Sequence, residues 1–337
     1  MEHNGKKVLV TGGTGAVGPV LVRQLLEDGY RVRLFARETS DLSSLPLDQI
    51  EVVRGDITQH KLVWEAAEEQ EIILHLAAML HINQPTGNLH PRYYAVNVDG
   101  TRNVLDAARI AQSKQVILFS TISVYGETNQ TCLANEDAPL KGDSFYAKTK
   151  AEADQIGLQV GAGPEGPAVT VLRLASVYGP TMKGNYVRLL GALKRGLYCQ
   201  VGSGDNRRTL VHAEDVARAT LAVLSTPSDL VAGKIYNVTD EGPHTMSEII
   251  DAMCQALDSP QPRFKIPESP LRFALKQAEQ AQRILGRTPK IGTFTLDKLL
   301  EDVAVDGSRL RNEVGFVPRY SLINGWRQTV EQLLVVA

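Results

Sequence analysis

The segment 6–18, KKVLVTGGTGAVG, constrains the fold of this chain more than any other stretch. A short apolar run ends at Thr11, four glycines follow, and a helical pattern of apolar residues begins directly after them. A strand, a glycine-rich turn and a helix N-terminus in this order predict a dinucleotide-binding site, although similar spacing also occurs in ordinary strand-to-helix turns. In this interpretation Gly12 allows the tight turn, Gly15 lets the backbone approach a pyrophosphate, and Gly18 lets the helix pack closely on the strand.

Composition narrows the class of protein further. The 337 residues suffice for a large core, and the formal net charge of -2 without a basic block argues against nucleic-acid binding. The polar start, MEHNGKK, shows no signal peptide, and no apolar run reaches the roughly 18–20 residues that span a bilayer. Three scattered cysteines indicate reduced thiols, and the histidines lack metal-ligand spacing. We therefore expect a cytoplasmic protein without a structural metal, a nucleic-acid partner or a membrane partner.

Strand and helix patterns alternate through the first half of the chain, which predicts an α/β fold: a doubly wound parallel Rossmann sheet with right-handed crossovers. The expected strands are 31–36, 50–53, 71–77, 114–120 and 169–174, and the expected helices between them are 61–69, 95–112 and 144–161. Several strands are nearly all apolar, as is typical of strands covered on both faces.

The alternation loosens after residue 174, which predicts a smaller substrate-binding lobe at the carboxyl edge of the sheet. We assign 1–178 to the dinucleotide-binding domain, with returns near 208–238, and 179–207 with 239–337 to the lobe. The expected elements here are helices at 186–195, from 214 onward and at 246–257, and a strand at 234–238. A capping box, Thr245 with Glu248, opens the helix at 246, and a proline-rich stretch at 259–270 indicates loops.

The end of the second strand bears on the choice of nicotinamide cofactor. NAD-preferring sites place a carboxylate there, whereas this strand ends in Ala36 and Arg37. A guanidinium suits a 2′-phosphate, so NADP(H) is favoured and NAD(H) remains open; the alternative is that Arg37 is a solvated surface charge. Asp56, after the third strand, is placed either to meet the adenine amino group or to cap a helix.

Tyr146 and Lys150, in YAKTK, form the candidate catalytic pair. Residues four apart share a helix face, and a cation near the phenol would lower the tyrosine pKa from about 10 toward working pH. Tyr146 could then act as general acid/base for a carbonyl–alcohol pair, with Lys150 also holding the nicotinamide ribose. Thr121 and Ser123 follow the fifth strand and could bind the substrate oxygen, or could merely cap the next turn. A lone YxxxK match is more often structural than catalytic.

Taken together, the motifs TGGTGAVG, GDI, LHLAA, NVDGTRNVLDAA, STISVYG, YAKTK, LRLASVYGP and RTLVHAEDVA resemble those of extended short-chain dehydrogenases/reductases, in the epimerase/dehydratase branch, over roughly residues 6–240. The resemblance implies a catalytic triad of Thr121, Tyr146 and Lys150 with Ser123 as a helper. It also implies a homodimer built on the helices 95–112 and 144–161, and it sets the predicted ligand contacts. For the cofactor these are Gly12, Thr14, Gly15, Ala16, Val17, Gly18, Arg37, Asp56, Ile57, Leu76, Ala77, Ala78, Asn97, Tyr146, Lys150 and Ser176; for the small-molecule substrate they are Met79, Thr121, Ser176 and Arg208.

Three functions stay open, and departures from the family pattern rank them. The first is an NADP(H)-dependent oxidoreductase acting on a secondary alcohol or ketone. The second is a nucleotide-sugar 4-epimerase with tightly held NAD. Ser176 argues against this function, because nucleotide-sugar relatives usually have asparagine at that position. Dehydration is disfavoured because Ile122 and Ser123 replace the acidic pair of the dehydratases. The third is a non-catalytic dinucleotide sensor, which ranks last because tyrosine and lysine are both present.

Overall fold

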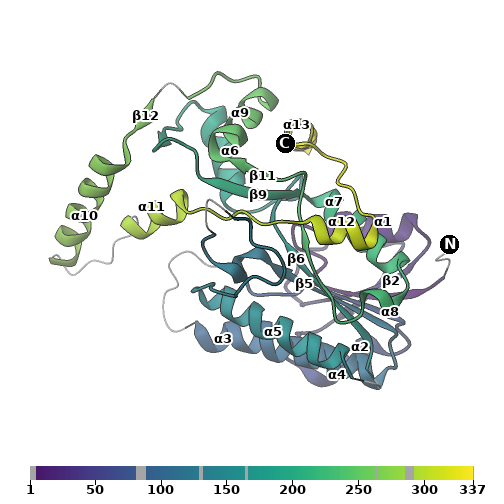
Figure 1. Cartoon of the computed structure of the whole chain (residues 1–337). Coiled ribbons are helices and arrows are strands. Elements are labelled where there is room, and N and C mark those ends of the chain that lie inside the picture. The colour runs from purple at the N-terminus through teal and green to yellow at the C-terminus, as the bar shows by residue number, and fades with distance from the viewer. Residues whose placement is uncertain are drawn as a thin grey trace.

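The computed structural model describes residues 5–80, 89–128, 132–163, 166–262, 264–284 and 292–336. Figure 1 shows a sheet flanked by helices on both faces, with a smaller lobe above the sheet. His81 and part of the expected substrate-binding stretch after Met79 lie outside the described residues. None of the helices in the described ranges is both long and apolar enough to cross a membrane.

Seven parallel strands form the main sheet, which confirms the predicted fold class. In the order in which they pair, the strands are β10 (Ile235–Val238), β6 (Ala168–Leu174), β5 (Gln115–Thr121), β4 (Ile72–His75), β1 (Lys7–Thr11), β2 (Arg31–Ala36) and β3 (Glu51–Arg54). The strand order reverses between β1 and β4, and ligands of such sheets bind in the crevice outside the carboxyl ends of the strands at that point.

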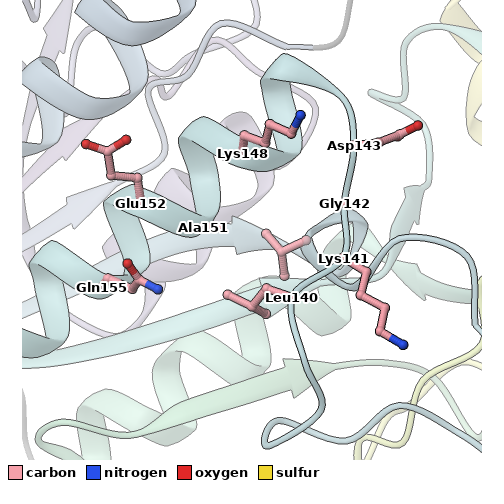
Figure 2. A pocket seen from close by; sticks show the side chains of 9 residues that line it. Leu140, Lys141, Gly142, Asp143, Lys148, Ala151, Glu152 and Gln155 are labelled. Atoms are coloured by element: carbon pink, nitrogen blue, oxygen red, sulfur yellow. The ribbon is translucent and has the colours of Figure 1, made fainter.

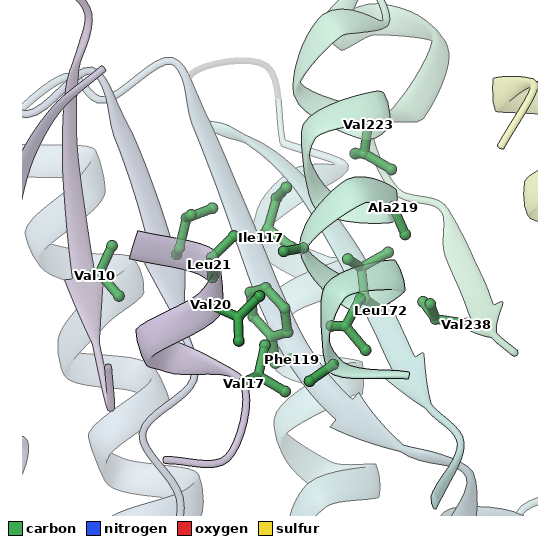
Figure 3. Close-up of a cluster of buried hydrophobic side chains, with 14 of the residues drawn as sticks. Val10, Val17, Val20, Leu21, Ile117, Phe119, Leu172, Ala219, Val223 and Val238 are labelled. Atoms are coloured by element: carbon green, nitrogen blue, oxygen red, sulfur yellow. The ribbon is translucent and has the colours of Figure 1, made fainter. Parts of the chain in front are cut away.

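The two faces of the sheet carry separate apolar cores, because successive side chains of a strand point to opposite faces. In β1, Val8 and Val10 join one core while Leu9 joins the other. The first core packs against α1 (Gly18–Glu27), α7 (Ala213–Ser225) and α12 (Ser308–Val314). In Figure 3, Val20 and Leu21 of α1 and Val223 of α7 lie over the sheet residues Phe119 and Leu172.

The second core packs against α2 (His60–Ala67), α4 (Gly100–Ile110) and α5 (Phe145–Gly161). Ahead of α4 the chain forms α3 (His90–Tyr94) and a five-residue π-helical segment, η1 (Ala95–Asp99). The predicted uniform helix at 95–112 is therefore wrong in its first turn, and another short helix, which begins at His90, precedes it. π-Helical turns occur frequently at functional sites.

The lobe contains two small sheets and several helices. One sheet joins β7 (Ser176–Tyr178), β9 (Arg207–His212) and β11 (Pro243–Thr245), and the other joins β8 (Gln200–Val201) and β12 (Lys265–Ile266). The helices of the lobe are α6 (Asn185–Lys194), α9 (Met246–Ala256), α10 (Glu268–Ile284), α11 (Thr293–Leu300) and α13 (Leu322–Val336). The short helix α8 (Ser228–Val231) lies beside β6 of the main sheet. The capping box of Thr245 and Glu248 is confirmed.

The prediction of loops throughout 259–270 is wrong, because β12 lies within this stretch and α10 begins at Glu268. Pro270 falls in the first turn of α10, where a proline removes no intrahelical hydrogen bond. Val303, Val305, Leu310 and Phe316 pack in the first core of the main sheet. Part of the segment assigned to the lobe thus belongs with the sheet, and the proposed domain division stays a prediction.

Candidate active site

The glycine-rich turn after β1 has the geometry that its sequence predicts. Gly12 has a φ of +74°, and a Cβ on it would lie 2.4 Å from the amide nitrogen of Ala77. A Cβ on Gly18 would lie 2.1 Å from the carbonyl oxygen of Gly13, so α1 packs tightly on the turn. A Cβ on Gly15 would meet only the Gly12 oxygen, at 3.3 Å. Gly15 thus leaves the approach to the turn open.

The N-terminus of α1 provides the matching anion site. Its N-cap, Val17, makes no side-chain hydrogen bond to the free N–H groups of the first turn. Such groups, at the positive end of the helix dipole, bind phosphate. The predicted dinucleotide contacts of Thr14, Gly15 and Ala16 in this turn stay predictions. The Thr181 hydroxyl donates to the Ala16 carbonyl, and Lys183 donates to the Thr14 carbonyl at 3.1 Å.

The adenosine end of the predicted site lies at the carboxyl end of β2. Ala36 is buried, whereas Arg37 is exposed and has no ion-pair partner among the described residues. Arg54, which sequence reasoning did not single out, donates to the Arg37 carbonyl at 2.6 Å. Arg54 is the last residue of β3 and pairs with Ala36, so two arginines lie at the carboxyl ends of neighbouring strands. The position of Arg54 at the end of an expected strand is a signal that could have placed it beside Arg37.

Asp56 lies in the turn between β3 and α2. Its carboxylate accepts hydrogen bonds from the Thr58 amide at 2.9 Å and the Thr58 hydroxyl at 2.7 Å. The residue that caps α2 is Gln59, so the helix-cap alternative for Asp56 is wrong. The adenine contact stays a prediction. Ile57 is buried and would touch a Cβ on Gly100 at 3.0 Å, which fixes this turn against α4.

A buried histidine that sequence reasoning missed connects β1 to α4. The Nδ1 atom of His75 lies 2.8 Å from the Thr11 hydroxyl, and its Nε2 atom lies 3.1 Å from the Thr101 hydroxyl. Because Thr101 donates its own proton to the Asn97 carbonyl, His75 must donate from Nε2 and accept at Nδ1. Burial lowers the pKa of His75 to about 3, with Lys150 acting in the same direction, so the ring is neutral.

Asn97, in the π-helical turn, fixes the chain that leaves β4. Its amide accepts from the Met79 N–H at 2.7 Å and donates to the Met79 carbonyl at 3.2 Å. The same amide donates to the Thr149 hydroxyl of α5 at 3.1 Å. Both amide hydrogens are thus used within the protein, and the residue is fully buried. The predicted contacts of Asn97, Met79 and the half-buried Leu76, Ala77 and Ala78 with ligands stay predictions.

The four predicted catalytic residues gather where β5 ends and α5 begins. Thr121 ends β5 and caps the 3-10 turn η2 (Ile122–Tyr125): its hydroxyl accepts from the Ser123 amide and donates to the Ser123 hydroxyl, both at 3.1 Å. The Thr121 hydroxyl also acts on the Tyr146 phenol and lowers its pKa. Thr121 therefore caps the turn, and its catalytic role stays a prediction. Ser123 is exposed, Tyr146 is partly buried, and Lys150 is 3 % exposed.

The electrostatics of Tyr146 differ from the sequence-based expectation. Burial raises its pKa to about 12, only partly offset by the Thr121 hydrogen bond, while Asp154 and Tyr93 raise it further. The expectation that Lys150 lowers this pKa is therefore not met in the protein alone. Burial also lowers the pKa of Lys150, which Asp154 opposes. The charge of Lys150 interacts with Asp154 and with His75, and Tyr146 carries its proton at neutral pH.

The predicted substrate contacts on β7 and β9 lie in a polar cluster of the lobe. Ser176 and the positive charge of Arg208 both act on the Tyr186 phenol of α6, and both lower its pKa. Arg208 is itself engaged: its guanidinium lies 3.3 Å from the Glu301 carboxylate and donates to the Lys298 carbonyl at 2.6 Å. A diphosphate that used Arg208 would therefore compete with Glu301.

A hollow of about 810 Å³ lies on the outer side of α5, away from the catalytic group. Figure 2 shows that Lys148, Glu152 and Gln155 of the helix line it, opposite the loop from Leu140 to Asp143. Tyr146 and Lys150 are four residues apart and therefore share one face of the helix. The helical residues that line the hollow lie on the opposite face. This hollow is therefore not the predicted active site.

The fold and the glycine-rich turn define a dinucleotide-binding α/β protein with a tyrosine–lysine pair at the edge of its sheet. The model of the NAD dependent epimerase/dehydratase family matches residues 8–239, so the chain belongs to this family, within the extended short-chain dehydrogenases/reductases, and is an enzyme of that type. This confirms the family that the sequence motifs predict.

Three similar proteins show how varied the family is. The chain is 26% identical to a 3β-hydroxysteroid dehydrogenase/Δ5→4-isomerase of Mycobacterium tuberculosis, over 94% of this chain and 87% of that protein. It is 24% identical to the N-acetyl-α-D-glucosaminyl-diphospho-ditrans,octacis-undecaprenol 4-epimerase of Escherichia coli O157:H7, over 98% and 96% of the two chains. The UDP-glucose 4-epimerase of Thermus thermophilus in complex with NAD has the same fold, with a TM-score of 0.76 at 23% identity over 98% and 100%.

Proposed function

We propose that this protein is an NAD(P)-dependent oxidoreductase that transfers hydride at a secondary alcohol or ketone. The observation that carries the proposal is the placement of Thr121 at the end of β5 and of Tyr146 and the buried Lys150 four residues apart on α5. A phenol held by a strand-end hydroxyl at the carboxyl edge of a parallel sheet is placed for proton exchange with a bound substrate. The hydroxysteroid dehydrogenase relative performs this class of chemistry by its name.

Each residue has a defined part in the proposed reaction. The bound nicotinamide supplies or accepts the hydride at the substrate carbon. Tyr146 donates the proton to the substrate oxygen during reduction and removes it during oxidation, while Thr121 orients the phenol. Ser123 is exposed and binds the same oxygen. Lys150 holds the ribose of the cofactor and places positive charge close to the reacting oxygen, which favours developing negative charge there.

NADP(H) is the proposed cofactor. The support is Arg37, exposed beside Arg54 at the end of β2, and the absence of an acid at Ala36. Guanidinium groups bind phosphate in a bidentate manner, so this strand end suits a 2′-phosphate better than a free ribose hydroxyl. NAD(H) is the competing cofactor, since it is bound in the epimerase of the same fold.

A nucleotide-sugar 4-epimerase is the second candidate, supported by the epimerase relative from E. coli. Its chemistry needs the same Tyr146 and Lys150, with the hydride returned to the substrate within one turnover. Two features argue against a diphosphate-bearing substrate. Arg208 already pairs with Glu301, and position 176 is a serine. The third function, a non-catalytic sensor, does not agree with the membership of the chain in this enzyme family.

The deciding experiment is to denature the freshly purified protein and identify any released nucleotide by mass. We expect an empty site that then binds NADPH more tightly than NADH, because a reductase exchanges its cofactor every turnover. Stoichiometric NAD⁺ that survives purification would instead support the epimerase. Tight nucleotide binding with no hydride transfer to any ketone or nucleotide sugar would contradict both candidates.

We further propose a cytoplasmic homodimer. The support is the pairing of α4 with α5 on one face of the sheet, together with exposed apolar side chains at Ile110 and Phe145, one on each helix. Light scattering coupled to size-exclusion chromatography measures the mass directly. A single-chain mass at micromolar concentration would contradict the dimer.

A further inference from the structure

A row of three side chains on the inner face of α5 continues beyond the predicted catalytic pair. Tyr146, Lys150 and Asp154 follow one another at intervals of four residues, so they lie along one face of the helix. Lys150 is 3 % exposed and Asp154 is 1 % exposed. A carboxylate buried one turn from a buried ammonium group is its natural counter-ion.

Asp154 is held in place from the neighbouring strand. The Nε atom of Arg173, on β6, lies 3.0 Å from the Asp154 carboxylate, and Arg173 is 2 % exposed. Arg173 also donates to the Tyr125 phenol at 2.9 Å and to the Glu136 carbonyl at 3.4 Å, with its guanidinium 5.0 Å from the Tyr125 ring centre. Burial raises the pKa of Asp154, and the cations of Arg173 and Lys150 oppose this rise, so the ionised carboxylate depends on its ion pair with Arg173.

Among the groups named here around Lys150, Asp154 is the one that can serve as its counter-ion. On α5 these are Tyr146, which is neutral, and Asp154; from β4 comes the neutral ring of His75, and from β6 the cation of Arg173. Removing Asp154 would leave two buried cations, Lys150 and Arg173, without the carboxylate between them. Because arginine keeps its proton, the lysine would give up its own.

We propose that Asp154 is a positioning residue that keeps Lys150 cationic and directed toward the bound cofactor and Tyr146. The proposal rests on the role of Lys150 in the proposed function, and it adds a residue that touches neither substrate nor cofactor. Burial lowers the pKa of Lys150 and Asp154 raises it, in agreement with this arrangement.

The test measures the protonation of Lys150 directly in the cofactor-free protein. Lysine labelled with ¹³C at Cε gives one NMR signal per lysine, and the signal lost in Lys150→Met assigns Lys150. Asp154→Asn is expected to move the Lys150 titration midpoint down by about one to two pH units, and Asp154→Glu to restore most of it. Glu152→Gln removes a carboxylate from the outer face of the same helix and is expected to leave the midpoint unchanged.

A double variant separates the counter-ion role from folding. Asp154→Asn combined with Arg173→Met removes both members of the ion pair, so no unpaired arginine is buried. The Lys150 midpoint is again expected below that of the unmodified protein, although less far than in Asp154→Asn alone. An unchanged midpoint in either variant would overturn the proposal.

Kinetics provide a second readout. The protonated form of Lys150 is lost at lower pH in Asp154→Asn, so the alkaline limb of the rate profile should move to lower pH with little change in KM for substrate. If hydride transfer is not detected at all, the proposed function fails while the NMR titration still decides the role of Asp154.

Discussion

The backbone of Gly12 lies directly against that of Ala77, so that a Cβ on Gly12 would stand 2.4 Å from the Ala77 amide nitrogen. The φ of +74° at Gly12 adds backbone strain to this clash for any other residue. We expect Gly12→Ala to lower stability by about 1–3 kcal/mol and to weaken nucleotide binding at least tenfold, because the turn must shift. Thermal melts and nucleotide titration measure both effects. Gly242→Ala, where a Cβ meets nothing within 4 Å, is the control.

Tyr146→Phe tests the general acid/base. Removal of the phenol hydroxyl is expected to reduce kcat by about 10²–10⁴-fold, because the phenol is the group proposed to exchange the proton. Nucleotide affinity should stay within a few-fold, since the ring and Lys150 remain. Steady-state kinetics with fluorescence titration of NADPH separate the two quantities. Full activity in the variant would remove Tyr146 from the proposed triad.

Arg37→Ala tests the cofactor preference. Loss of the guanidinium at the end of β2 should weaken NADPH much more than NADH, because only the former carries a 2′-phosphate. Arg31→Ala, at the opposite end of the same strand and also exposed, is the matched control and should change neither affinity. Equal weakening of both cofactors in Arg37→Ala would mean that Arg37 does not contact a 2′-phosphate.

His75 should make folding stability depend on pH. Its pKa is about 3 in the folded protein and about 6.5 when unfolded, so the unfolded chain binds an extra proton between these values. Stability is therefore complete above about pH 6.5 and falls as the pH decreases, by up to about 1.4 kcal/mol per pH unit from this residue. Urea denaturation between pH 7 and 5 measures the slope.

His75→Gln should flatten that slope, because glutamine can still accept from Thr11 and donate to Thr101 without titrating. His60→Gln, at an exposed histidine of α2, is expected to leave the slope as it is. A slope that is the same in all three proteins would contradict the neutral, buried state of His75.

Much of the sheet could be predicted from the sequence because its strands are buried on both faces. Strand β2 has the predicted bounds, 31–36, β5 is displaced by one residue at each end, and β6 begins one residue earlier than predicted. The π-helical turn at 95–99 could not be predicted, since it depends on the contacts of Asn97 with Met79 and Thr149, which are distant in sequence. At α10, Pro267 just before the helix and Pro270 in its first turn favoured a loop, although the helix continues for several turns after them.

The candidate site was predictable where a motif is local. The spacing of Tyr146 and Lys150 placed both on one helix face, and Thr121 is joined to them as expected. The raised pKa of Tyr146 was not predictable, because it results from burial by distant segments. Asp154 fits the same spacing as the pair, but its partner Arg173 comes from another strand, so the ion pair became visible only in three dimensions.

The contacts of Thr181 and Lys183 with the carbonyls of Ala16 and Thr14 join the first segment of the lobe to the glycine-rich turn. A nucleotide bound to this turn as proposed would also stabilise the adjoining lobe segment, and its release would loosen that segment. We expect catalysis to follow a compulsory order, in which the nucleotide is first to arrive and last to leave.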